Sequence, residues 1–365
     1  MSHFYESMLI NTTDGIQCKT YANIHPDNYV IVKPKYIPTD LMDSSRLKHR
    51  FLFSKCMLRF NLFTESKVVN EVMQNFRKSL PDYVLEDKNH NNWFFVVPKS
   101  KIKDVPDARS GLRELMKVPY DDLDSYLKST VDLVNILIEA GTPSEDIGIM
   151  HSTLLGNYTV GKSDIDLVVF GKKNGWKVMD FLNTVKHPKL RWKTEKDWLK
   201  YYTDRVVSKF YTPAEYVLSM VRKKDDGFID NNVFSIFVVE KPDECWYSWQ
   251  DLHEPIGVVK ITANVSDDYN SIVRPGFYEI ENSKIVKILS QKTKSGIDKA
   301  IIVKRLVTWS RPFVLQAKKG ESIMAVGLLE RVTTKKEIYY QLVIGYFDSF
   351  ITGRAALEFM KVPVR

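Results

Sequence analysis

The hydrophobic residues of this chain recur with two different periods, and each period predicts a type of element. Residues Asp122–Ala140 carry apolar side chains at helical spacing and stop at Gly141, which predicts a helix that faces the core. Thr212, Pro213 and Glu215 form the pattern of a capping box and predict a helix that runs to Lys224. Other helical or partly helical segments are expected at Leu47–Ser54, Lys67–Leu80, Trp176–Val185 and Thr194–Phe210.

Strand-like runs dominate the two ends of the chain. Near the N-terminus they are Tyr29–Lys33, Met57–Phe63 and Trp93–Val97. Near the C-terminus they are Ile256–Thr262, Gly276–Ile280, Lys284–Leu289, Ala300–Thr308, Ser322–Leu329 and Ile338–Tyr346. We therefore expect an α+β protein in three parts. An N-terminal α+β accessory domain (1–105) shows no visible chemistry, a central domain (106–245) mixes helices and strands, and an all-β domain (246–365) forms a small barrel or sandwich, with an OB-like barrel as one option.

The central segment contains two carboxylates, Asp164 and Asp166, at the start of the run SDIDLVVFG. At a strand period of two they point to one face, and Ile165 and Leu167 point to the other. Two carboxylates on one rigid face repel each other unless a cation neutralises them, and Mg2+ prefers oxygen ligands. The pattern indicates a site for Mg2+ or Mn2+, although an isolated Asp-x-Asp is also typical of a solvated turn.

The residues before this run form a second pattern. Ile147–His151 reads as a short strand, and Ser152–Asn157 as a turn that enters a helix. A Ser hydroxyl and backbone N–H groups at such a turn can bind phosphate, and Gly156 allows the helix to approach its surroundings closely.

The combination of strand, Ser turn, Gly and SDIDLVV resembles the signature of the DNA polymerase beta-like nucleotidyltransferase superfamily. In that resemblance Asp164 and Asp166 are the first two metal ligands, Ser152 is the signature Ser, and His151 replaces the usual Gly. More diffusely, the segments TTDGIQC…IHPDNYVIVKPKYIP, SDIDLVVFG and RPFVLQAKKGESIMAVGLLERV resemble a group of archaeal proteins described as predicted nucleotidyltransferases.

The resemblance implies a core of a mixed sheet with helices. It implies transfer of a nucleoside monophosphate from an NTP to a hydroxyl, with two Mg2+ ions held by Asp164 and Asp166. The residues expected to contact the nucleotide are Ser152, Thr153, Gly156, Lys162 and Arg205. Arg222, Lys223 and Lys224 are further options, although cations also suit a helix C-terminus.

A third carboxylate in the superfamily lies in the middle of a later strand. The corresponding strand here is Val233–Glu240, and Ser235 occupies that position. Glu240 and Asp230 are the nearest acids, and Glu240 is the better candidate for the general base. The departure leaves open a catalytically degenerate protein that binds nucleic acid or has a regulatory role.

Residues Gly156–Ser163 also match the Walker A pattern, GNYTVGKS. A P-loop needs a helix that begins at the Lys-Ser pair, whereas the residues after Ser163 alternate as a strand. The P-loop reading is therefore a secondary alternative to the nucleotidyltransferase reading.

Composition and charge indicate which partners the protein could bind and in which compartment it is expected. The net charge is +8, and it is concentrated in the two outer segments, which fits RNA or DNA as an acceptor but also fits an ordinary basic surface. Trp246, Trp249 and Trp309 could stack on bases or fill a core. No apolar run is long enough to span a membrane, no signal peptide is visible, and the three cysteines form no framework, so we expect a cytoplasmic protein without a membrane partner.

Overall fold

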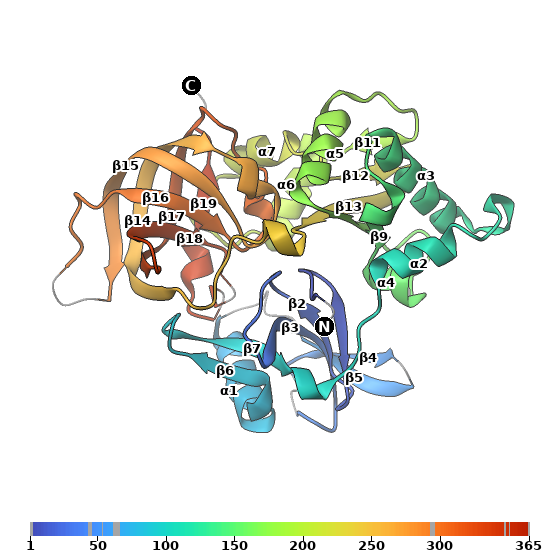
Figure 1. The fold of residues 1–365 in the computed structure, drawn as a ribbon, viewed down its shortest axis with the longest axis horizontal. Helices are drawn as coiled ribbons and strands as arrows, with labels where there is room; N and C mark the ends of the chain where they lie inside the picture. Colours follow the sequence, from blue (N-terminus) through green and yellow to red (C-terminus); the bar gives the residue numbers. More distant parts are fainter. Residues whose placement is uncertain are drawn as a thin grey trace.

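The computed structural model describes residues 3–42, 46–52, 54–60, 66–292, 296–346, 348–349 and 351–363. Its described residues form three sheets and seven α-helices, with more strand than helix, so the expected mixed α+β class is confirmed. The sheets follow one another along the chain, in residues 9–104, 147–239 and 252–361. Figure 1 shows them as three neighbouring bodies that meet in the middle of the molecule.

The first sheet has the order β4-β5-β3-β2-β1-β8, and β7 joins β3 while β6 joins β7. Its strands are β1 (Leu9–Thr12), β2 (Gln17–Thr20), β3 (Tyr29–Pro38), β4 (Lys48–Leu52), β5 (Lys55–Arg59), β6 (Val84–Asp87), β7 (Asn92–Pro98) and β8 (Ile102–Asp104). Helix α1 (Ser66–Ser79) packs on it through Phe76. The partly helical prediction for Leu47–Ser54 is wrong, because β4 pairs with β5 along its whole length. The part of Met57–Phe63 beyond Phe60 lies outside the described residues.

The central sheet has the order β11-β12-β13-β10-β9. Its strands are β9 (Ile147–Ile149), β10 (Ile165–Phe170), β11 (Leu190–Trp192), β12 (Asp226–Ile229) and β13 (Asn232–Val239), and its helices are α2 (Ala108–Leu115), α3 (Ser125–Glu139), α4 (His151–Leu155) and α5 (Lys172–Thr184). Strands β10 and β13 are parallel, and the other pairs are antiparallel. Helices α3 and α5 bury one face of this sheet, which leaves the other face for the N-terminal segment.

The third sheet closes into a barrel, because β14 pairs with both β15 and β17 in the cyclic order β14-β15-β16-β18-β17. Its strands are β14 (Leu252–Asp267), β15 (Gly276–Gln291), β16 (Val303–Thr308), β17 (Ser322–Thr333) and β18 (Ile338–Ile344), with β19 (Phe359–Lys361) added to β17. The expected small barrel is thus a closed five-stranded barrel, an architecture that OB folds also use. The two strands predicted at Gly276–Ile280 and Lys284–Leu289 are one continuous strand, β15.

Two helices from the central segment pack on the barrel. They are α6 (Glu195–Arg205) and α7 (Pro213–Val221), and Trp198 and Tyr216 are buried in the same core as barrel residues Tyr278 and Phe359. A second shared core joins the N-terminal sheet to the barrel through residues such as Phe94 and Trp309. The three sheets are therefore joined by packed hydrophobic cores.

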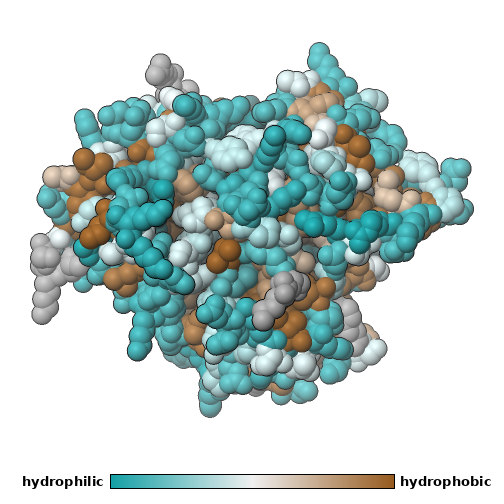
Figure 2. Space-filling model, in the orientation of Figure 1, coloured by the Kyte–Doolittle hydropathy of each residue, from teal (hydrophilic) through white to brown (hydrophobic). Residues whose placement is uncertain are grey.

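The surface in Figure 2 is mostly hydrophilic, with hydrophobic residues in small separate groups. Among the described residues, no helix is long and apolar enough to cross a membrane.

Candidate functional site

The two predicted metal ligands lie where strand β10 begins. Ile165 and Leu167 are buried against the helices, whereas Asp166 points to the opposite face and Asp164 precedes the strand and is exposed. Partial burial and then the charge of Asp166 raise the pKa of the Asp164 carboxyl. The alternation predicted from the sequence is therefore present along β10, and Asp166 lies on the face opposite helices α3 and α5.

His151 holds Asp166 in place. Its Nδ1 lies 3.0 Å from Asp166 Oδ2, and its Nε2 lies 3.2 Å from the carbonyl oxygen of Ser7. Burial tends to raise the pKa of Asp166, but the contact with His151 and the charge of Lys19 outweigh burial and lower it. His151 adopts a φ of 50°, a left-handed conformation that favours Gly.

The turn predicted to hold phosphate has mainly structural contacts. The hydroxyl of Thr153 lies 2.7 Å from Tyr126 Oη, and the same Tyr126 hydroxyl donates a hydrogen bond of 2.9 Å to the carbonyl of Asp164. Helix α4, which contains Ser152, has only five residues. Gly156 follows it with a φ of 67°, and a Cβ added there would meet no atom within 4 Å, so this glycine serves the turn and not close approach.

Lys162 lies in an exposed turn between α4 and β10. After Ser163 the chain enters strand β10, so the helix that a P-loop requires does not follow the Lys-Ser pair. This arrangement argues against the Walker A alternative.

A carboxylate that the sequence reasoning missed lies in the same row as Asp166. Asp166 on β10 is directly opposite Ser235 on β13, and Ser235 is directly opposite Asp226 on β12. Residues opposite one another point to the same face, so Asp166, Ser235 and Asp226 share one face. Asp226 forms ion pairs with Lys193 and, at 3.7 Å, with Arg311. The four-residue strand β12 carries too little periodicity to be recognised in the sequence.

The candidate bases from the sequence lie elsewhere. Glu240 follows the far end of β13, is buried, and forms an ion pair of 3.1 Å with Lys172; burial raises its pKa to about 7. Since five residues separate it from the row of Ser235, roughly 16 Å along a strand, this placement removes Glu240 as a base beside the aspartate pair. Asp230 accepts a hydrogen bond of 2.9 Å from Ser129 of α3, on the face covered by helices.

Three lysines lie together on the N-terminal sheet, and two of them, Lys19 and Lys35, interact electrostatically with Asp166. Lys19 on β2 is directly opposite Lys33 on β3, and Lys35 is two residues further along β3. Within the described chain, their ammonium groups form no hydrogen bond and no ion pair, and each lies over an aromatic ring, as Lys33 does at 3.8 Å from the Tyr21 centroid. Burial lowers the pKa of Lys33 to about 7 and that of Lys19 and Lys35 to about 8. Residues 1–105, expected to lack visible chemistry, thus supply three cations.

Cations from separate parts of the chain converge over the ring of Phe237, two residues after Ser235 on β13. The ring centroid is 5.1 Å from Lys19 Nζ, 5.3 Å from Arg274 Cζ and 4.5 Å from Arg311 Cζ. Arg274 is paired with Glu6 at 2.8 Å, and Arg311 is paired with Asp225 at 3.5 Å. The face that carries Asp166 therefore brings together cations from the N-terminal sheet and from the C-terminal segment of the chain.

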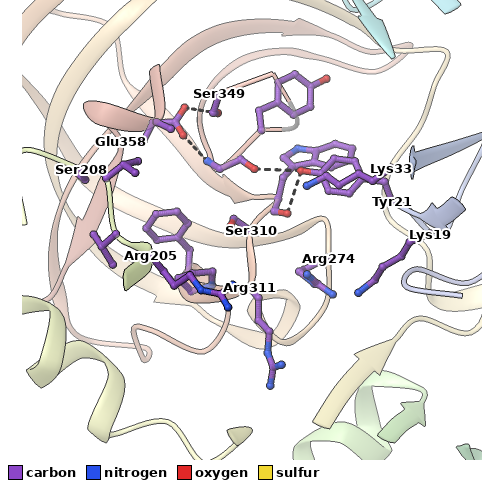
Figure 3. Close-up of a pocket in the computed structure, with 18 of the residues that line it drawn as sticks. Lys19, Tyr21, Lys33, Arg205, Ser208, Arg274, Ser310, Arg311, Ser349 and Glu358 are labelled. Carbon is purple, nitrogen blue, oxygen red and sulfur yellow. Dashed lines mark hydrogen bonds between the residues drawn. The ribbon is translucent and has the colours of Figure 1, made fainter. Parts of the chain in front are cut away.

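These cations also line a cavity of about 400 Å3. Figure 3 shows Lys19, Lys33, Arg205, Arg274 and Arg311 around one space. Arg205, on α6, lines this cavity, and its predicted contact with a nucleotide stays a prediction. Tyr21, Trp309 and Tyr201 are among the aromatic residues of the lining.

Other predicted residues have structural partners. Arg222 is paired with Glu321, Lys223 donates to the carbonyl of Arg311 at 3.1 Å, and Lys224 lies over the ring of Trp192. Trp249 and Trp309 are buried in the core between the N-terminal sheet and the barrel.

Few side chains near the start of β10 could bind a metal ion. Among the described residues, no group of three or more His, Cys, Asp or Glu side chains could hold a metal ion. Mg2+ is often bound by one or two carboxylates, with water and substrate phosphates as the remaining ligands. The pair Asp164 and Asp166 therefore fits Mg2+ that binds together with a nucleotide.

Comparison with known proteins gives one match and no function. The chain is 25% identical over 359 residues to an uncharacterized protein of Methanocaldococcus jannaschii, and the alignment covers 97% of each chain. No family model matches the sequence. No solved structure matches it either.

Proposed function

We propose that this protein is a nucleotidyltransferase that moves a nucleoside monophosphate from an NTP to a hydroxyl acceptor. The observation that carries the proposal is the juxtaposition of Asp164 and Asp166 with cations that have no acidic partner. Asp166 lies on the face of β10 opposite helices α3 and α5, and the charge of Lys19 acts on it. A carboxylate pair beside unneutralised cations suits a metal-bound phosphate ester. The order β9, α4, β10, α5 around the aspartates also agrees with the polymerase beta-like core implied by the sequence.

In this proposal Asp164 and Asp166 hold the metal. Mg2+ or Mn2+, when bound, would polarise the phosphate and lower the pKa of the attacking hydroxyl. His151 positions the Asp166 carboxylate through its Nδ1 contact, in the manner of an outer-shell partner that orients a ligand. The charge of Lys19 and Arg311 stabilises negative charge that develops beside Asp166.

Asp226 supplies the third carboxylate in this proposal. Two strand spacings separate it from Asp166, roughly 9.6 Å, and the small side chain of Ser235 lies between them. An acceptor hydroxyl placed above Ser235 lies within reach of Asp226, which then accepts its proton. The acceptor itself is proposed only as a hydroxyl, with a nucleic-acid end among the candidates.

The test measures pyrophosphate release from each of the four NTPs with Mg2+ or Mn2+ and with RNA, DNA or small hydroxyl acceptors. We expect release in the wild type, and a loss of about 100-fold or more in Asp164→Asn, Asp166→Asn and Asp226→Asn. Asp180→Asn, on the exposed surface of α5, is the matched control and should leave the rate unchanged.

The results separate this proposal from its alternatives. Formation of ADP and phosphate in place of pyrophosphate would favour an NTPase. Binding of nucleic acid without pyrophosphate release under any condition would favour the degenerate protein, for which Ser235 in place of an acid is the specific observation. A normal rate in Asp226→Asn alone would remove only the third carboxylate.

A further inference from the structure

We propose that the central cavity, and not the turn at Ser152, binds the polyphosphate group of the substrate, through Lys19 and Lys33 of the N-terminal sheet with Lys35 beside them. That the polyphosphate belongs to a nucleotide rests on the proposed function. The binding of a polyphosphate chain does not, because it follows from the charges around the cavity.

The lysines are arranged in a way that opposes folding unless an anion is present. Lys19 and Lys33 are directly opposite each other on neighbouring antiparallel strands, where like charges repel. Glu6 is the nearest acid on the lining, but it is committed to Arg274, to which its two carboxylate oxygens lie at 2.8 and 2.9 Å. Partly buried cations without an acidic partner are costly, and an anionic ligand would offset that cost.

The balance of charge favours a ligand with several negative charges. Lys19, Lys33, Arg205, Arg274 and Arg311 line the cavity, against only two acids, Glu6 and Glu358. Glu358 is itself paired with Arg354 at 2.7 Å. Of the five cations, Arg274 and Arg311 have acidic partners and are held in fixed positions, whereas Lys19, Lys33 and Arg205 have none among the described residues. Three such cations suit adjacent phosphate groups better than a single phosphate.

The volume and the walls limit the size of the ligand. A space of about 400 Å3 lies within the range of small-molecule sites and is too small for a duplex. Tyr21 is fixed in the wall because its hydroxyl donates to the carbonyls of Trp309 at 3.3 Å and Gly345 at 3.2 Å, and its ring lies 5.2 Å from that of Trp309. Both rings are buried, so they form a rigid apolar wall behind the lysines. Figure 3 shows Tyr21 beside Lys33 in this wall.

The turn expected from the sequence offers much less. The hydroxyl of Thr153 is used by Tyr126, helix α4 is a single short turn, and Lys162 is exposed. The cavity and the aspartates nevertheless share two cations, because Lys19 and Arg311 line the cavity and also act on Asp166. A polyphosphate bound by Lys19 in the cavity would therefore lie beside a cation that also acts on Asp166.

The test is calorimetry of the full-length protein with inorganic tripolyphosphate, in the presence of EDTA. We expect binding in the wild type that is at least tenfold weaker in Lys19→Met and in Lys33→Met. Lys287→Met, at an exposed position on β15, is the control and should bind as the wild type. AMP, with one phosphate, should bind more weakly than tripolyphosphate. The thermal unfolding of each variant is recorded, and Lys33→Gln is a second variant if Lys33→Met does not fold.

Two results would overturn the inference: wild-type affinity in folded Lys19→Met and Lys33→Met, or no binding of tripolyphosphate at millimolar concentration. Asp166→Asn separates this inference from the proposed function, because it should keep or tighten metal-free binding of tripolyphosphate. Tripolyphosphate binding without pyrophosphate release from any NTP would reject the transferase and keep the cavity. Pyrophosphate release that is unaffected in Lys33→Met would instead keep the transferase and reject the cavity as the polyphosphate site.

Discussion

Lys33, proposed above to bind phosphate, illustrates how a single buried charge can reduce stability. Its ammonium group lies over Tyr21 and has no acidic partner in the described chain, and burial lowers its pKa to about 7. A lysine whose folded pKa is below the unfolded value of about 10.5 contributes stability that is present above pH 10.5 and is lost progressively as the pH falls to about 7. Protonation of Lys33 therefore destabilises the ligand-free fold at neutral pH.

We therefore predict that Lys33→Met stabilises the ligand-free protein. The wild type should lose about 2 kcal/mol more unfolding free energy than the variant between pH 9 and pH 7. Chemical denaturation of both proteins at the two pH values measures this difference, with Lys287→Met as the control. Parallel pH profiles for the wild type and Lys33→Met would show that Lys33 is not a destabilising charge.

At the scale of single residues, the sequence predicted the aspartate pair but not its surroundings. The sequence pointed to Asp164 and Asp166 because residues two positions apart along an extended chain lie on the same face. Lys19 and Arg311 lie far apart in the chain and come together over the ring of Phe237 on β13. Asp226 was missed because it is brought to the row by the pairing of β12, which no local pattern signals.

The segment from α4 to β10 shows how local structure separates two similar motifs. The sequence GNYTVGKS matches Walker A, but the chain leaves Ser163 as a strand paired on both sides, with β9 and β13. The capping box at Thr212 was confirmed, because its pattern is complete within four residues. Elements with such local signals were predicted well, whereas the edge strand β4, with mostly exposed side chains, depends on its partner β5.

At this scale we predict that Lys162→Ala has little effect. Its side chain is exposed in the turn, so pyrophosphate release and tripolyphosphate affinity should each change by less than about twofold, as for other surface substitutions. Gly156→Ala is the informative neighbour: it should destabilise the protein by about 1 kcal/mol, because Gly156 has a φ of 67°. A 100-fold loss of activity in Lys162→Ala would restore the P-loop reading.

The whole molecule is held together by cores that cross the boundaries expected from the sequence. Trp198 and Tyr216, from the central segment, are buried in the barrel core, and Phe94 of the N-terminal sheet packs with Trp309. The barrel also supplies Arg274 and Arg311 to the cavity. The barrel is therefore part of the proposed site and not only a separate nucleic-acid-binding module.

We predict that removal of residues 246–365 abolishes both folding of α6 and α7 and pyrophosphate release. These helices lose the apolar partners of Trp198 and Tyr216 and should become sensitive to proteolysis. The full chain should unfold in a single calorimetric transition. A truncated protein with a cooperative transition and Asp166-dependent activity would instead show that the barrel is dispensable.

The walls of the cavity also set the time at which the proposed site can first exist during synthesis. Lys33 leaves the ribosome early and Arg311 late, and chains generally fold from the N-terminal end as they emerge. An unfinished chain can form the strand that carries Asp166, but it lacks the last cationic wall. If the proposed activity exists, products of interrupted translation would lack it, because the site is complete only once the barrel has been made and has closed.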